Sequence, residues 1–214
     1  MKGCRPLSDA EVLRLRKALS TTRYAARNIA LLDLGLYTGY RISELLSLRL
    51  RDVCNESGQL VSTITVDRRF MKGKHESRSM CLPDPAKESL RGWLDELYAA
   101  GCRAPLQYVF VSSRWTNRRM HPASCWLLLH NAARAAGIGG RIGTHSMRKT
   151  YSRKFLTLML QDATHSQDPY AAQLDAWRAL QQALGHKSIA STQSYVGQVD
   201  EGKIFSVVGR IRFE

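Results

Sequence analysis

Apolar side chains recur three and four positions apart along much of the chain, a spacing typical of helices with one buried face. The first such segment begins at Ser8, whose hydroxyl is suited to cap free backbone N–H groups. Asp9 and Glu11 then favour the positive end of the helix dipole. Further helices are expected over about residues 25–37, 42–48, 84–97, 122–136, 144–160 and 168–184, with a short one after Ser188.

Two short segments alternate between apolar and polar residues instead, as strands do. The first contains Ile64 and Val66, and the second lies around Met80, so residues 72–77 are expected at the tip of a β-hairpin. A third, buried strand is expected at residues 109–111. Together the elements predict an α+β fold, a mainly helical domain with a small antiparallel sheet.

The length of 214 residues favours one domain over residues 1–214, with a core at about 8–197. Apolar residues in the tail, 198–214, favour docking on a neighbouring subunit, and packing on the chain's own core is nearly as well supported. The N-terminus lacks the apolar stretch of a signal peptide, and no segment approaches the ~20 apolar residues that span a bilayer.

The charge balance is unusual for a globular protein. Thirty-two Lys and Arg against eighteen Asp and Glu leave a formal charge of +14. The cations are spread over folded segments, which favours a surface that wraps a nucleic acid, whereas an incidentally basic or ribosome-type protein is the alternative.

Five scattered cysteines and six histidines show no ligand spacing, and no glycine-rich phosphate loop occurs. We therefore expect reduced thiols and neither a metal nor another cofactor.

Three motifs carry candidate chemistry. In residues 144–148, His145 and Arg148 share one helix face near an N-terminus, where free N–H groups suit a phosphate, provided that Thr144 caps the helix. The alternative is a capped surface helix with a solvated His and Arg. Single motifs of this kind often arise by chance.

The second motif follows Gly39, which is expected to end a helix. Arg41 stands at the entrance of the next helix, and a guanidinium matches two phosphate oxygens at once. Glu44, one turn on, is suited to hold the guanidinium in place, although an ordinary salt bridge within the helix is the alternative.

In the third motif His186 follows a glycine turn and Tyr195 lies further on. Nearby cations and a base make a tyrosine usable as a nucleophile.

The order of these pieces resembles the tyrosine recombinase (phage integrase) family. The matching segments are residues 38–45, 144–148, 184–186 and Tyr195, and the resemblance extends from about Ser8 to Gly197. The family usually carries an N-terminal helical domain, and none is seen before Ser8, so the chain reads as a catalytic fragment or a minimal recombinase.

The resemblance implies a role for each matching residue. Tyr195 would attack the scissile phosphate and form a 3′-phosphotyrosyl link, while Arg41 and Arg148 hold the non-bridging oxygens. His145 would assist proton transfer, and His186 would hydrogen-bond the phosphate. Glu44 would support this site.

Lys72, at the hairpin tip, would protonate the leaving oxygen. Lys74 is the alternative acid, and the turn can also be read as a basic loop that touches phosphates without chemistry. Further DNA contacts are expected from Lys74, Arg78, Lys149 and Lys187.

The expected function is therefore a site-specific recombinase or integrase of a mobile genetic element that cleaves and rejoins double-stranded DNA. We expect a homotetramer on DNA, assisted by accessory DNA-bending proteins and located in the cytoplasm with the nucleoid. The alternatives are a type IB topoisomerase-like nicking-closing enzyme and a catalytically silent DNA-binding regulator of the same fold. A binder alone has no need of a tyrosine so placed, which argues against the last.

Overall fold

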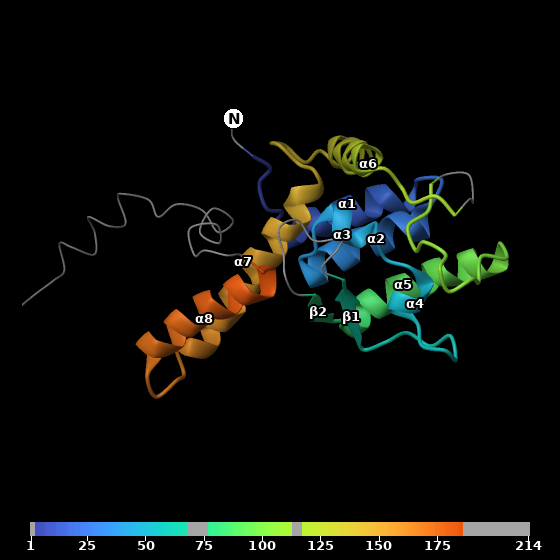
Figure 1. Cartoon of the computed structure of the whole chain (residues 1–214). Coiled ribbons are helices and arrows are strands. Elements are labelled where there is room, and N and C mark those ends of the chain that lie inside the picture. The colour runs from blue at the N-terminus through green and yellow to red at the C-terminus, as the bar shows by residue number, and fades with distance from the viewer. Residues whose placement is uncertain (1–2, 68–76, 113–116, 186–214) are drawn as a thin grey trace, which may run out of the picture. The chain divides into compact units, whose positions relative to one another are not determined.

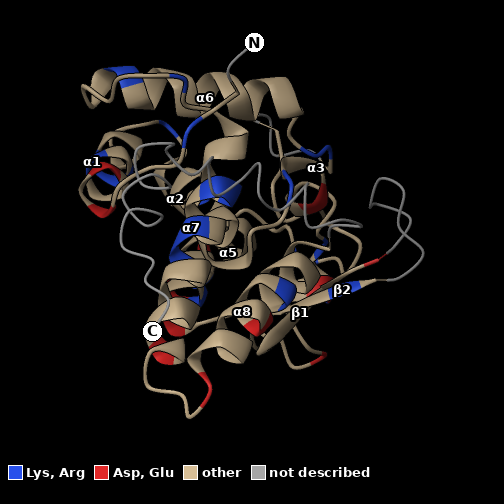
Figure 2. Ribbon diagram, turned by 90° about the vertical axis from the view of Figure 1, so that its left-hand side faces the viewer, with Lys and Arg blue, Asp and Glu red and all other residues tan. Residues whose placement is uncertain are grey.

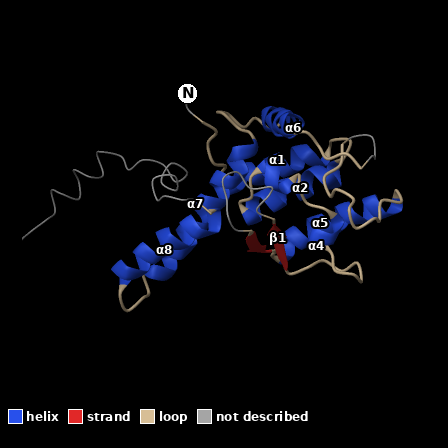
Figure 3. Ribbon diagram, in the orientation of Figure 1, coloured by secondary structure: helices blue, strands red, loops and turns tan. Residues whose placement is uncertain are grey.

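The computed structural model describes residues 3–67, 77–112 and 117–185 and is mainly helical, with one small antiparallel sheet (Figures 1 and 3). This confirms the predicted α+β fold. The elements, in chain order, are α1 (Asp9–Ser20), α2 (Ala25–Thr38), α3 (Ile42–Leu45), α4 (Leu50–Val53), β1 (Thr63–Val66), β2 (Arg78–Cys81), α5 (Asp84–Ala99), α6 (Pro122–Ala135), α7 (Thr144–Ala163) and α8 (Pro169–Leu184).

The chain divides into two compact units, Met1–Phe155 and Leu156–Glu214, and α7 belongs partly to each. A shared helix does not decide whether the units fold together, so the single domain expected over residues 1–214 stays a prediction. Among the described residues, no helix is long and apolar enough to cross a membrane.

The core of the first unit is built around α2, which packs against α1 and α5. Most of α2 is buried, whereas α5 buries a single stripe that includes Leu90, Trp93 and Leu97. The indole N–H of Trp93 donates to the carbonyl of Val109 at 2.7 Å, so a buried aromatic ring also satisfies a loop carbonyl.

The start of α1 agrees with the sequence. Ser8 and Glu11 form a reciprocal capping box: the Ser8 hydroxyl accepts from the Glu11 N–H at 3.2 Å, and the Glu11 carboxylate accepts from the Ser8 N–H at 2.9 Å. Gly39 ends α2 in the left-handed region, with φ of 60°.

Tyr40 fastens the sheet to the end of α2. The strands pair in antiparallel register, with Ile64 opposite Met80 and Val66 opposite Arg78. The buried hydroxyl of Tyr40 lies 2.8 Å from the carbonyl oxygens of both Ile64 and Arg78, one on each strand. The expected tip of this hairpin lies outside the described residues.

The structure corrects several predicted elements. The helix expected over 42–48 ends at Leu45, because the Ser47 hydroxyl and N–H both bond the carbonyl of Glu44, and α4 then forms unpredicted. Residues 109–111 are buried, but among the described residues Val111 forms only an isolated bridge with Arg119. The Val109 N–H donates to the carbonyl of Leu48 and the Phe110 carbonyl accepts from the Met120 N–H, so these partners belong to loops and not to a strand.

Helix α8 begins and ends close to the predicted positions, with Asp168 as its N-cap and Gly185 as its C-cap. Leu174, although apolar, is 47% exposed. The buried stripe consists of Ala176, Leu180 and Leu184, which recur every four residues, and Leu174 lies off that line.

Candidate functional site

Arg41 sits at the junction between α2 and α3. The left-handed turn at Gly39 reverses the chain, and Arg41 becomes the N-cap residue of α3. Its backbone N–H donates to Glu44 Oε2 at 2.8 Å, and its Nη1 donates to Oε1 at 3.0 Å. The Arg41 side chain remains 26% exposed, while the Glu44 side chain is fully buried. The guanidinium is therefore bound to a buried carboxylate on one side and accessible to solvent on the other.

A second arginine reaches the same carboxylate from the sheet. Nη2 of Arg78 lies 3.2 Å from Glu44 Oε2, and its guanidinium lies 4.2 Å from the centre of the Tyr40 ring. Burial raises the pKa of Tyr40 to about 12, against a smaller opposing effect of Arg78. Arg78 is only 7% exposed, and the Glu44 carboxylate and the Tyr40 ring hold its charge inside the protein. Its expected role as a DNA contact stays a prediction.

Arg148 is held by backbone instead. Helix α7 starts at Thr144, so the expected cap is displaced by one residue, and the Ser146 hydroxyl accepts from the Gly143 N–H at 3.2 Å. One turn on, Arg148 is 1% exposed and its Nη1 donates to the carbonyl of Gly39. This bond joins the start of α7 to the turn that precedes Arg41.

His145 has an exposed side chain whose pKa lies below the usual value. Desolvation is the largest cause, followed by the positive charges of Arg148, Arg41 and Lys149. The lowered pKa favours a neutral imidazole, which can accept a proton. Arg148 bonds the carbonyl of Gly39, two residues before Arg41, and His145 lies on the same helical turn as Arg148, so the structure gathers three of the predicted site residues in one place.

The remaining predicted residues lie outside the part of the chain that the structure describes. They are Lys72, Lys74, His186, Lys187 and Tyr195. Within residues 3–67, 77–112 and 117–185, no group of three or more His, Cys, Asp or Glu side chains is placed to hold a metal ion.

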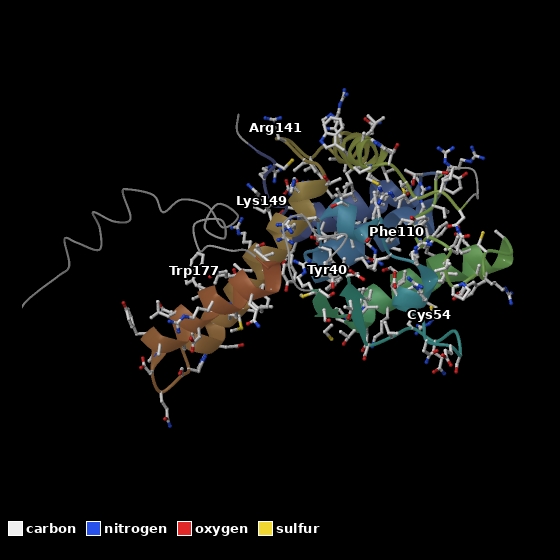
Figure 4. The ribbon with its side chains drawn as sticks, in the orientation of Figure 1. Tyr40, Cys54, Phe110, Arg141, Lys149 and Trp177 are labelled. Carbon is white, nitrogen blue, oxygen red and sulfur yellow. The ribbon has the colours of Figure 1, made fainter. Side chains whose placement is uncertain are left out.

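Cations continue along α7 beyond the site. Lys149 is partly exposed, and Arg153 and Lys154 are exposed, so blue segments recur on this helix in Figure 2. Figure 4 shows Lys149 on α7 and Arg141 on the segment that leads into it. Lys154 is paired with Asp9 at 2.8 Å. The first turns of α7 therefore carry positive charge to the surface beside the buried Arg148, as an interface with phosphates requires.

The sequence did not single out three groups that shape the site: the Gly39 carbonyl, Tyr151 and Tyr40. Tyr151 follows Arg148 by three residues, so helical spacing alone places both on one face. Its ring occupies the space that a Cβ at position 39 would need. Nothing in the local sequence indicates that Tyr40 bonds both strands, because that contact depends on how the hairpin packs.

Comparisons with known proteins identify the family and the fold. Residues 5–161 match the model described as the phage integrase family. The tyrosine recombinase XerA of Pyrococcus furiosus is 30% identical over 190 residues, which cover 88% of this chain and 56% of that protein. The tyrosine recombinase XerD of Oceanobacillus iheyensis is 30% identical over 189 residues, with the same coverage. The chain thus spans little more than half the length of these relatives.

Solved structures with the same fold include the XerA recombinase, with a TM-score of 0.69 and 24% identity over all of this chain and 68% of that one. The XerH site-specific recombinase, in a post-cleavage complex with its palindromic difH substrate, gives a TM-score of 0.65 and 20% identity. That match covers 96% of this chain and 52% of that one. Likeness at this level of identity establishes the architecture.

Proposed function

The chain belongs to the phage integrase family, and on that premise we propose that it is a site-specific recombinase that cleaves and rejoins double-stranded DNA through Tyr195. The observation that carries the proposal is the placement of Arg41, His145 and Arg148 together, although the first is separated from the others by about half the chain. Two guanidinium groups beside a histidine of lowered pKa form an arrangement suited to a phosphodiester that is changing its charge.

In the proposed reaction the Tyr195 oxygen attacks phosphorus and the bond to the 5′-oxygen breaks. The tyrosine loses a proton and the leaving oxygen gains one, so a 3′-phosphotyrosyl link and a 5′-hydroxyl result. The new phosphodiester conserves the energy of the old one, so rejoining is the same step in reverse and needs no external energy.

Each residue then has a separate task. Arg41 and Arg148 hold the non-bridging oxygens, and loss of one such donor slows the chemical step by about 10²–10³-fold. His145 takes part in proton transfer at the nucleophile, and His186 hydrogen-bonds the phosphate. Lys72 protonates the leaving oxygen, with Lys74 as the alternative. Lys74, Lys149 and Lys187 contact the DNA backbone.

The proposed partner is duplex DNA, on which the protein acts as a homotetramer with accessory DNA-bending proteins, in association with the nucleoid. The charge of +14 supports this partner, because neutralised phosphates release counterions and so drive binding. The apolar tail, residues 198–214, is proposed to dock on a neighbouring subunit. The alternative is that it packs on the core of its own chain.

The direct test is a nicked suicide substrate that carries the cognate site. The wild-type protein should form a covalent protein–DNA adduct on a denaturing gel, and Tyr195→Phe should not. Arg148→Lys, which keeps the charge, should lose most of the cleavage rate but little DNA affinity, with the exposed Arg91→Lys on α5 as the matched control.

Other outcomes identify other functions. Binding without an adduct on any cognate site indicates a catalytically silent regulator. An adduct together with relaxation of supercoiled DNA, but without strand exchange between paired sites, indicates a nicking-closing enzyme. Exchange of flanking DNA between two labelled duplexes supports the recombinase.

A further inference from the structure

We propose that Arg78 is a positioning residue for Arg41: by occupying one oxygen of Glu44, it leaves part of the Arg41 guanidinium available to a phosphate. The consequence for DNA cleavage rests on the proposed function, while the positioning itself rests on the geometry alone. The sequence indicates a DNA contact at this position, whereas the ion pair with Glu44 and the stacking on Tyr40 point to an internal role.

The shared carboxylate is the centre of the arrangement. Glu44 Oε1 accepts from Arg41 Nη1 at 3.0 Å, while Oε2 accepts from the Arg41 backbone N–H at 2.8 Å and lies 3.2 Å from Arg78 Nη2. Each oxygen therefore serves a different guanidinium. Within the part of the chain that the structure describes, Arg41 and Glu44 share a single side-chain bond and not the side-on, two-bond pairing that arginine and carboxylate otherwise prefer.

Burial makes this division of the two oxygens consequential. The Glu44 side chain is fully buried and that of Arg78 is 7% exposed, whereas that of Arg41 is 26% exposed. A buried carboxylate that loses one cation attracts the other more strongly, because water cannot replace the lost partner. Without Arg78, Arg41 is expected to turn both of its outer nitrogens toward Glu44, away from a phosphate.

Arg78 is itself firmly fixed. Its backbone pairs with Val66 in the sheet, its carbonyl lies 2.8 Å from the Tyr40 hydroxyl, and its guanidinium stacks on the Tyr40 ring at 4.2 Å. Tyr40 directly precedes Arg41 in the chain. The sheet, Tyr40 and Glu44 thus form one connected support, and the position of β2 is transmitted to the arginine at the site.

A DNA contact makes different demands. A side chain that neutralises a phosphate on binding releases a counterion, so its removal lowers the salt dependence of binding by about one counterion. A positioning residue changes the rate of the bound complex and leaves that slope unaltered. The two roles are therefore separable by experiment.

The first test needs neither DNA nor activity. Phenylglyoxal modifies accessible guanidinium groups, and mass spectrometry follows the modification at Arg41 in the full chain. In Arg78→Met the modification of Arg41 should slow several-fold relative to wild type, and in Arg91→Met, an exposed control on α5, it should not change. An unchanged or faster reaction at Arg41 in folded Arg78→Met overturns the proposal.

The second test uses single-turnover cleavage at saturating DNA. Arg78→Met should cleave about 10–100-fold more slowly, by partial loss of one guanidinium donor, with affinity and salt slope unchanged. Arg78→Lys keeps a charge near Glu44, so its cleavage rate should lie between those of wild type and Arg78→Met. It also replaces Arg78→Met in the test if that variant does not fold. Glu44→Gln with Arg78→Met should lose no more rate than the worse single variant, because both act through Arg41.

Losses that multiply in the double variant, or a salt slope reduced by about one, would show that Arg78 acts on DNA directly. Absence of any adduct from the wild-type protein refutes the proposed function, and the phenylglyoxal result then still decides the role of Arg78.

Discussion

The two arginines at the site are held in opposite ways. Arg41 rests on a buried carboxylate that it shares with Arg78, and its side chain is 26% exposed. Arg148 is 1% exposed and donates to the backbone carbonyl of Gly39. The position of the first is set by charge and that of the second by the path of the chain.

The difference predicts which substitutions each region tolerates. The region of Arg41 should respond to the loss of a charge even when the shape is kept, because a buried ion pair cannot lose one member without cost. The region of Arg148 should respond to a change of backbone shape even when every charge is kept. Substitutions that change only charge or only backbone shape separate these two sensitivities.

The largest effect is expected from Gly39→Ala. At φ of 60° the new Cβ would overlap the Tyr151 ring and disturb the carbonyl that Arg148 uses. We expect a loss of about 3–5 kcal/mol in the free energy of unfolding, from backbone strain and overpacking together. Urea denaturation followed by circular dichroism measures it.

Gly58→Ala is the matched control for this change. Gly58 also has a positive φ, 75°, but no atom lies within 4 Å of the added Cβ. It should lose only about 1 kcal/mol, the cost of the left-handed conformation. If both variants lose the same amount, packing against Tyr151 does not define the turn.

Glu44→Gln should have the next largest effect. The amide keeps the shape but leaves Arg41 and Arg78 without their shared charge, at a cost of about 3 kcal/mol by the same denaturation assay. Asp175→Asn, which removes an exposed pair with Arg178 on α8, is the control and should change stability by less than about 1 kcal/mol. A loss from Glu44→Gln as small as that of the control contradicts a charge-held Arg41.

A pH dependence should link the two arginines through His145. Because desolvation and the charges of Arg148, Arg41 and Lys149 lower its pKa in the folded state, the unfolded chain binds the proton more readily. The stability that His145 contributes is therefore present above the ordinary histidine pKa of about 6.5 and is lost as pH falls through the lower pKa of the folded state.

The measurement is urea unfolding across this range for wild type and His145→Asn. The difference between them should grow in favour of the variant as the pH falls. With either Arg41→Gln or Arg148→Gln added, the difference should shrink. A difference that is constant with pH, or one that favours wild type in acid, would show that the cations do not act on the imidazole.

The smallest effect is expected at Glu11, in the first turn of α1. Its hydrogen bonds with Arg5 are the largest cause that lowers its pKa to about 2 from 4.5, so its contribution to stability is present above pH 4.5 and is lost as pH falls toward 2. Glu11→Gln should cost about 1 kcal/mol at neutral pH, as the loss of a helix cap and a partly exposed ion pair does. A variant that still loses stability over that acid range as wild type does would exclude Glu11 as the source.

How far the sequence predicts this protein depends on the range of the interactions involved. The start of α1 at Ser8, the end of α2 at Gly39 and both ends of α8 follow from caps that act within a few residues. The predicted strand at residues 109–111 was wrong, because a strand needs a neighbouring strand, which the local sequence pattern does not reveal.

The site divides in the same way. Glu44 lies one helical turn from Arg41, so spacing alone predicted their contact, and the structure shows it. Arg78 lies 34 positions from Glu44, and the sequence indicated only a DNA contact there. Folding carried it inward, because the sheet packs on Tyr40 and leaves a buried carboxylate within its reach.

The sequence by itself determined the helices, the hairpin, the excess of positive charge and the order of motifs typical of the phage integrase family. The tertiary structure decided that Arg148 meets the Gly39 carbonyl across 109 positions, and that Arg41 and Arg78 share one carboxylate. The physical reason is that caps and helical spacing act over a few residues, whereas burial and shared ion pairs exist only once distant segments pack together.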